Sequence, residues 1–197
     1  MANRMKLPHL NITDEYIEIP KKFHSFLEEG PFKRCVVCEK YLLSGGTQYV
    51  IEKAFIKSEV KFEYALCLVC LDQFRNAYSE QSKAVIESYF NEKIDLQKRR
   101  KNLLDAKGTN INSWISDCLF TSKSFPRVKE YQIYAHCFDG YLLFTYLPFM
   151  ICSDVLGEIY QKLSSETKDE SGRFTRDYLN KMPDLNVSPS QPQLVLV

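Results

Sequence analysis

Alternating apolar and polar positions in the first half of the chain predict two neighbouring β-strands. In "YVIEKAFI", Tyr49, Ile51 and Phe55 lie on one face, and "VKFEYALC", residues 60–67, alternates in the same way. The turn cluster "SGGTQ" precedes the first strand. We therefore expect a β-hairpin between residues 49 and 67.

The apolar spacing becomes helical after this hairpin. Phe74 and Tyr78 begin a stripe that continues to residue 94, and neither Gly nor Pro interrupts the run before Gly108. This predicts one long helix, or two helices with a bend near Asn91. Upstream, "KKFHSFLEEG" predicts a short helix that ends at Gly30.

Strand and turn signals return after Gly108. "EYQIYAHC" and "YLLFTYL" flank Asp139-Gly140, a strong hairpin signal. Ser153 is the expected N-cap of a helix over "DVLGEIYQKL", and "GRFTRDYL" predicts another helical stretch. The chain then divides into an N-terminal segment (1–32), a cysteine module with its long helix (33–107), an α+β region (108–181) and a flexible tail (182–197).

Composition limits the class of protein. A chain of 197 residues with 45% hydrophobic residues can bury a substantial core, and 26 Lys and Arg against 25 Asp and Glu leave no global positive field for nucleic acid. The longest apolar stretch, "YLLFTYLPFMIC", is too short for a membrane span and contains Pro148. We expect a cytoplasmic protein whose seven cysteines stay reduced or bind metal.

Two CxxC pairs carry the strongest chemical signal. Cys35 and Cys38 form "CVVC", and 28 residues later Cys67 and Cys70 form "CLVC". Each pair places two thiolates on one side of an ion, and two pairs complete the tetrahedral shell that zinc prefers. A redox pair and four unrelated core thiols are the alternatives. We predict one structural Zn²⁺ ion, with no ligand position left open for catalysis.

The order of knuckle, hairpin and a second knuckle that opens a helix resembles the treble-clef group of zinc fingers over residues 33–95. The resemblance implies an α+β fold with a treble-clef-like zinc module, followed here by a second small β-hairpin plus helices. It assigns the four ligand positions to Cys35, Cys38, Cys67 and Cys70. It implies no particular activity.

The other cysteines lie in the second half of the chain. Alternation in "YQIYAHCF" points His136 and Cys137 to opposite faces, which argues against a second zinc site with Cys118 and Cys152. We expect Cys118 and Cys137 to be buried in the core. Cys152 precedes a helix, which lowers a thiol pKa, so a catalytic thiol with His136 as its base is the alternative to burial.

Short segments of the second half also resemble segments of the first half. "CVVCEK" matches "CLFTSK" at Cys118, and "EYALCLVC" matches "IYAHCFDG" at Cys137. A decayed repeat would then have Thr121 and Gly140 in place of the second cysteine of each pair.

Three classes of function remain. The closed zinc site and 13 Phe with 12 Tyr favour a non-enzymatic interaction or adaptor module that binds a protein partner or itself. Nucleic-acid binding would use the zinc module with Lys98, Arg99, Arg100 and Lys101, although such a charge run also suits an exposed helix end. A thiol enzyme would use Cys152.

The apolar end of the tail, Leu194, Val195, Leu196 and Val197, is a candidate docking strand, with a frayed terminus as the alternative.

Overall fold

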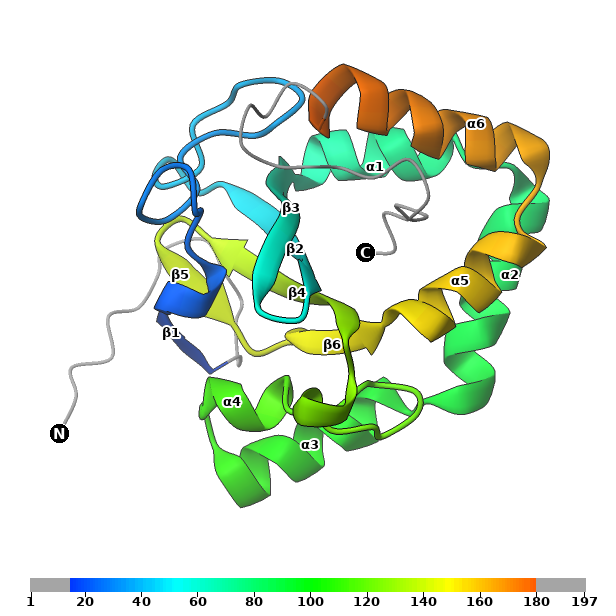
Figure 1. Ribbon diagram of the computed structural model, residues 1–197. Coiled ribbons are helices and arrows are strands. Elements are labelled where there is room, and N and C mark those ends of the chain that lie inside the picture. The colour runs from blue at the N-terminus through cyan, green and yellow to red at the C-terminus, as the bar shows by residue number, and fades with distance from the viewer. Residues whose placement is uncertain (1–14, 180–197) are drawn as a thin grey trace, which may run out of the picture.

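A six-stranded antiparallel sheet and its covering helices make up the computed structural model, which describes residues 15–179 (Figure 1). The sheet order is β1-β5-β4-β2-β3, and β6 pairs with β4 beyond the end of β5. All pairings are antiparallel. The strands are β1 (Tyr16–Glu18), β2 (Gln48–Ile56), β3 (Glu59–Cys67), β4 (Glu130–Phe138), β5 (Tyr141–Leu143) and β6 (Phe149–Cys152). The predicted mixture of helices and strands is confirmed, as is the hairpin of β2 and β3.

The helices form a curved layer beside the sheet (Figure 1). Phe174 packs against Tyr64 of β3 with ring centroids 5.2 Å apart, which fixes the end of α6 on the same sheet face as Glu52, the cross-strand partner of Tyr64. The helices are α1 (Leu68–Asn76), α2 (Glu80–Lys93), α3 (Leu96–Lys107), α4 (Ile111–Trp114), α5 (Ser153–Lys162) and α6 (Ser165–Phe174), followed by a π-helical turn at Thr175–Leu179.

The predicted long helix is wrong, because the run is divided into α1, α2 and α3. Ser79 accepts a hydrogen bond from the N–H of Ser82, and Asp95 accepts one from the N–H of Lys98. Each side chain therefore caps a new helix, and capping is favourable enough to end the preceding one. The bend expected near Asn91 falls at Ile94 and Asp95.

The short N-terminal helix is also wrong, since only Lys21–Phe23 forms a 3-10 turn. The Glu63 carboxylate of β3 accepts hydrogen bonds from the N–H of Phe26 (2.6 Å) and from the Ser25 hydroxyl (2.8 Å). These bonds hold residues 25–30 as a turn over the sheet, with Phe23 buried and Phe26 64% exposed. A further small correction concerns α5, whose N-cap is Cys152 rather than Ser153.

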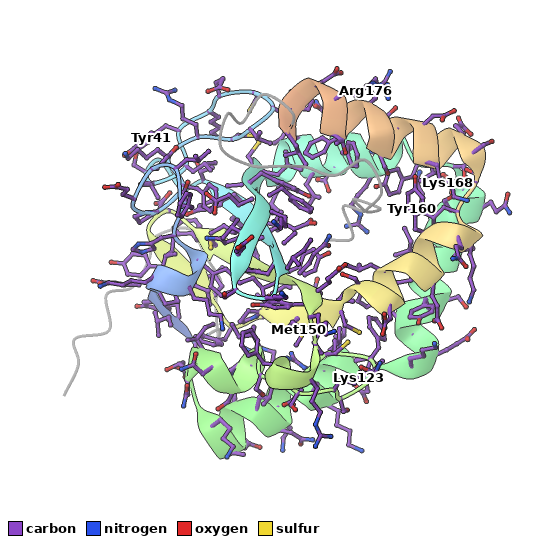
Figure 2. All side chains as sticks on the ribbon, viewed as in Figure 1. Tyr41, Lys123, Met150, Tyr160, Lys168 and Arg176 are labelled. Carbon is purple, nitrogen blue, oxygen red and sulfur yellow. The ribbon has the colours of Figure 1, made fainter. Side chains whose placement is uncertain are left out.

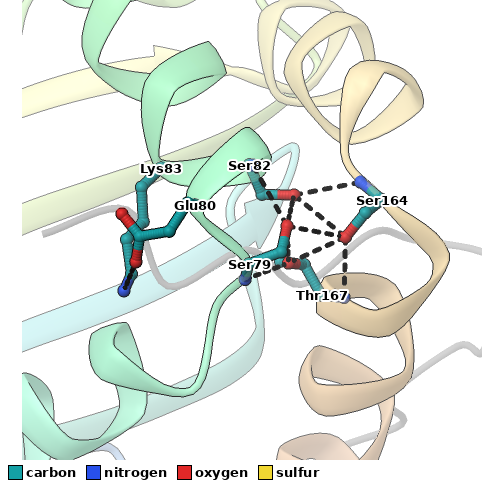
Figure 3. Close-up of polar contacts among 6 residues, drawn as sticks. All are labelled: Ser79, Glu80, Ser82, Lys83, Ser164 and Thr167. Atoms are coloured by element: carbon teal, nitrogen blue, oxygen red, sulfur yellow. Dashed lines mark hydrogen bonds and ion pairs between the residues drawn. The ribbon is translucent and has the colours of Figure 1, made fainter.

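Two serine N-caps join α2 to α6 (Figure 3). The hydroxyls of Ser79 and Ser164, which cap α2 and α6, lie 2.9 Å apart. The N–H of Ser79 donates to Thr167 Oγ1 (3.1 Å), and the N–H of Ser164 donates to Ser82 Oγ (3.0 Å). The two helix starts thus satisfy each other's free N–H groups.

Among residues 15–179, no helix combines the length and apolar character that crossing a bilayer requires. The predicted tail, 182–197, lies outside the described residues. The predicted boundary between 107 and 108 falls between α3 and α4, and the regions on its two sides contribute strands to one sheet.

Candidate metal centre

Four cysteine sulfurs gather at the end of the β2–β3 hairpin. The ligand atoms of Cys35, Cys38, Cys67 and Cys70 all lie within 4.8 Å of one another, and Cys38 Sγ is 3.7 Å from Cys67 Sγ. All but Cys38 are buried. The predicted ligand residues are therefore brought together, in an arrangement that can hold a metal ion.

The backbone of the first knuckle, residues 34–41, positions the first two sulfurs. The N–H of Cys35 donates to Lys40 O (2.9 Å), and the N–H of Glu39 donates to Cys35 O (3.0 Å). Glu39 has a φ of 60°, which lets the chain turn back on itself. The N–H of Val36 then donates to Ala65 O (2.9 Å) and docks the knuckle on β3.

The other two sulfurs come from the junction of β3 and α1. Cys67 ends β3 and is the N-cap of α1, so Cys70 lies in the first helical turn. The N–H of Cys67 donates to Cys35 Sγ (3.5 Å). Burial raises the pKa of Cys35, and hydrogen bonds from backbone N–H groups partly offset that rise. Burial and the neighbouring thiols also raise the pKa of Cys70, so a metal ion that binds here displaces protons.

The second half of the chain builds the same knuckle at residues 117–124. The N–H of Cys118 donates to Lys123 O (2.9 Å), and the N–H of Ser122 donates to Cys118 O (2.9 Å). Ser122 has a φ of 53°. The N–H of Leu119 donates to Met150 O (2.7 Å) and docks this knuckle on β6. In Figure 2, Tyr41 in the first knuckle and Lys123 in the second lie on opposite sides of the molecule.

The sheet relates the two halves by a pseudo-twofold axis. The nine-residue strands β2 and β4 pair over their full length, with Glu52 opposite Tyr134 at the centre. On the outer side of β2, Tyr49 pairs with Cys67, and on the outer side of β4, Tyr131 pairs with Cys152. The exchanged serine caps of α2 and α6 obey the same symmetry. The chain therefore contains two structural repeats, residues 34–93 and 117–174.

The predicted register of this repeat is wrong. Cys137 lies inside β4, which corresponds to β2, so Cys137 is no counterpart of Cys67. The counterpart is Cys152, which ends β6 and is the N-cap of α5. The signal for this was an apolar strand that ends in a cysteine directly before a helix, as at Cys67. The corresponding positions are Cys35 and Cys118, Cys38 and Thr121, Cys67 and Cys152, and Cys70 and Val155.

These second-half positions form what we call the two-cysteine site: Cys118, Thr121, Cys152 and Val155. In both sites the second position is exposed and the other three are buried. Cys118 and Cys137 are buried, as expected. His136 bonds to Gln48 Oε1 (3.0 Å). Within residues 15–179, the four-cysteine cluster is the group identified as able to hold a metal ion.

His136 is no base for Cys152. Cys152 pairs with Tyr131, five residues along β4 from His136, and a strand rises about 3.3 Å per residue, which separates them by roughly 16 Å. Cys118 Sγ, at 2.9 Å, is the close neighbour of Cys152 instead. This hydrogen bond, together with burial, raises the pKa of the Cys152 thiol.

The basic run on α3 makes internal contacts. Arg99 donates to Trp114 O (2.7 Å) and lies over the Trp114 ring, and burial lowers the pKa of its guanidinium to about 10. Arg100 Nε donates to Phe144 O (2.7 Å). Lys101 Nζ pairs with Asp105 Oδ2 at 3.2 Å on the surface, and Lys98 is exposed. Arg99 and Arg100 thus have structural roles within the fold. Nucleic-acid binding by this run remains a prediction.

Two surface pockets lie among residues 15–179. One, of about 550 Å³, is lined by charged residues of α6 and the turn after it, where Arg173 pairs with Glu170. Another, of about 390 Å³, includes Cys152 among Lys and Arg side chains. Neither contains a histidine.

No protein-family model, no curated protein and no solved structure matches this chain.

Proposed function

We propose that this protein is a zinc-stabilised, non-enzymatic interaction module that serves as an adaptor or regulatory subunit in the cytoplasm. The observation that carries this proposal is the four-cysteine cluster, whose ligand atoms lie within 4.8 Å of one another. Zn–S bonds of about 2.3 Å at tetrahedral angles require sulfurs about 3.8 Å apart. The 3.7 Å between Cys38 Sγ and Cys67 Sγ suits zinc in a treble-clef-like site.

A shell of four thiolates favours a structural ion over a catalytic one. Catalytic zinc sites use three protein ligands and keep the fourth position for water or substrate. Here cysteine occupies every position, and the thiolates need a reducing compartment to persist. The ion would therefore hold the first knuckle to α1.

Exposed apolar side chains around this centre support an interaction role. Val69, between the two cysteines of the second pair, is 64% exposed, and Tyr41 in the first knuckle is 47% exposed. Phe26 and Leu27, in the segment that leads into the knuckle, are exposed as well. Exposed apolar patches mark protein-binding surfaces, and Val69 and Tyr41 lie within three residues of cysteines of the site. We place the partner contact at this end of the molecule.

The test compares Val69→Glu with Tyr146→Glu. Val69 and Tyr146 are both exposed, and Tyr146 lies in the loop between β5 and β6. We expect the unmodified chain to carry one zinc per molecule and to self-associate or bind a protein partner. Val69→Glu should abolish that association and keep the zinc, whereas Tyr146→Glu should change neither. A chain that stays monomeric and binds no partner, or a complex that tolerates Val69→Glu, would contradict the proposal.

A further inference from the structure

Two thiols of the two-cysteine site lie in direct contact. Cys118 Sγ and Cys152 Sγ are 2.9 Å apart, and each residue is 2% exposed. In the four-cysteine site, Cys38 Sγ and Cys67 Sγ are 3.7 Å apart, a spacing that leaves room for an ion between them. The contact at Cys118 and Cys152 leaves no such room. A disulfide bond of about 2.05 Å would need the two sulfurs to approach by less than about 1 Å.

The other two positions of this site cannot complete a metal shell. Val155, the counterpart of Cys70, has no donor atom and is 3% exposed. Thr121 Oγ1 lies 3.8 Å from Cys152 Sγ and offers a neutral hydroxyl, a weak ligand for a soft ion. Two thiols in contact with an incomplete shell favour sulfur–sulfur chemistry over metal binding.

The surroundings activate one thiol of the pair. The Cys152 thiol donates a hydrogen bond to Cys118, and the N–H of Cys152 donates another at 3.2 Å. These bonds, with help from Thr121 and the N–H of Phe120, lower the pKa of Cys118, against the effect of burial. The lowered pKa favours the thiolate form of Cys118, and thiolate is the form that reacts with oxidants.

A surface pocket leads to the pair. It has a volume of about 390 Å³, and its lining includes Cys152, the cations Lys123, Arg127 and Lys129, and the acids Glu130 and Asp154. Lys123 Nζ lies 3.1 Å from Asp154 Oδ2, and the sulfurs of the pair contribute to the raised pKa of Lys123. A small oxidant that enters this pocket reaches Cys152, whose sulfur lies 2.9 Å from Cys118 Sγ.

We propose that Cys118 and Cys152 form a reversible dithiol–disulfide pair that hydroperoxides oxidise, in the repeat that has Thr121 and Val155 in place of two cysteines. The thiolate attacks one peroxide oxygen, the O–O bond breaks, and the departing oxygen takes a proton and leaves as water or an alcohol. The second sulfur then attacks the sulfenic acid, the S–O bond breaks, and the oxygen leaves as water with the second thiol's proton. Two thiols lose two electrons to one hydroperoxide, and a dithiol reductant such as dithiothreitol reverses the reaction.

The pair does not depend on the proposed zinc function, because it lies in the other repeat. Cys137 is the matched internal control: it is fully buried in β4, and Tyr49 hydrogen-bonds to it. Oxidation of Cys118 and Cys152 to a disulfide should therefore leave the Cys137 thiol unreacted.

The test uses the full, zinc-loaded chain in its reduced form. Hydrogen peroxide is added in increments, remaining thiols are alkylated, and peptide mass spectrometry locates any disulfide while a chromogenic chelator reports released zinc. We expect a Cys118–Cys152 disulfide, with the loss of the mass of two hydrogen atoms, before any zinc is released. Dithiothreitol should restore both thiols. Cys118→Ala and Cys152→Ala should abolish the disulfide, and Cys137→Ala should leave it intact.

Three results would overturn the proposal. The first is zinc release before any disulfide appears at Cys118 and Cys152. The second is a second metal ion bound per chain that protects these thiols from alkylation. The third is alkylation of Cys118 and Cys152 as slow as that of Cys137, with both thiols still free after peroxide. Because the peptide map is made on the unmodified chain, the test stands even if a variant fails to fold.

Discussion

The two knuckles share a backbone and differ in their chemistry. Cys35 and Cys118 make the same turn, with N–H to carbonyl distances of 2.9 Å in each, and each knuckle docks by one backbone bond on the outer strand of its repeat. At the position of Cys70, however, the second repeat has Val155. Backbone hydrogen bonds and one residue of positive φ thus form the knuckle in the second repeat with only two of the four cysteines.

The sheet shows the same contrast at its centre. The first repeat places Glu52 and Lys53 in β2, where both are buried, and the second repeat places Tyr134 and Ala135 at the corresponding positions of β4. Lys53 pairs with Glu63 at 2.9 Å, and Glu52 accepts a hydrogen bond from Tyr64 (2.6 Å). The first repeat therefore combines four cysteines that can hold a metal ion with buried charge, and the second has neither the four cysteines nor the buried ion pair. Four predictions test this difference.

Loss of a metal ligand should have the largest effect. Cys67→Ser in the first repeat removes a thiolate, and structural zinc contributes on the order of 10 kcal/mol to the folding of small zinc domains. We expect the knuckle and α1 to unfold. The measurements are zinc content and hydrogen exchange of the Val36 N–H, which bonds to Ala65 O. The matched variant Cys152→Ser should cost only about 1–2 kcal/mol, and equal losses in the two variants would contradict the comparison.

Removal of Glu63, the buried acid of the first repeat, should have the second-largest effect on stability. Glu63→Ala leaves Lys53 buried without its partner and frees the Phe26 N–H and the Ser25 hydroxyl. A broken buried pair costs about 3–5 kcal/mol. Chemical denaturation measures this loss of unfolding free energy. The surface variant Glu59→Ala, which removes the exposed pair with Lys61, should cost less than about 1 kcal/mol.

Two substitutions should rebuild the metal site in the second repeat. Thr121→Cys with Val155→Cys restores thiols at the positions of Cys38 and Cys70, so zinc should rise from one ion per chain to two. At free zinc 100-fold above its dissociation constant, the folded state gains about 2.7 kcal/mol. Metal analysis and thermal unfolding check this result. Thr121→Ser with Val155→Ala adds no thiols and should bind no second ion. Failure of the double cysteine variant to bind a second ion would disprove the geometric equivalence of the two sites.

The smallest effect should come from Glu52. Burial raises the pKa of Glu52 to about 8, although the Tyr64 hydrogen bond opposes the rise. The folded state then keeps a proton that the unfolded state releases, so the free energy of unfolding falls as the pH rises from about 4.5 to about 8. Glu52→Gln removes this ionisation and should flatten the curve.

We expect Glu52→Gln to stabilise the protein by on the order of 1–2 kcal/mol at pH 8, because the amide has its own burial cost. Urea unfolding from pH 5 to pH 9 measures the difference. Glu80, exposed in the first turn of α2, gives the control variant Glu80→Gln, which should keep the wild-type pH dependence. An unchanged slope in Glu52→Gln would show that Glu52 is ionised in the fold.

Local patterns in the sequence predicted β2, β3, β4 and the position of β5, together with the four cysteines that meet, but they did not predict β1 or β6. Alternation over 49–67 predicted β2 and β3, and the CxxC spacing predicted the cysteines that meet, because both signals depend on neighbours within a few residues. Helix ends were less predictable. The apolar stripe from Phe74 onward concealed the caps at Ser79 and Asp95, since a cap takes effect through a hydrogen bond that periodicity does not reveal.

Only the tertiary structure decided the pairing of the halves. The sequence comparison of the two halves aligned Cys137 with Cys67, because the neighbouring residues are most similar there. The strand pairings instead make Cys152 the residue that corresponds to Cys67. The contact of Cys118 with Cys152 and the burial of Glu63 under residues 25–30 likewise join residues more than 30 positions apart. Such contacts depend on how strands pair across the sheet. Sequence periodicity fixes which face a side chain occupies, whereas the sheet order fixes what lies opposite that face.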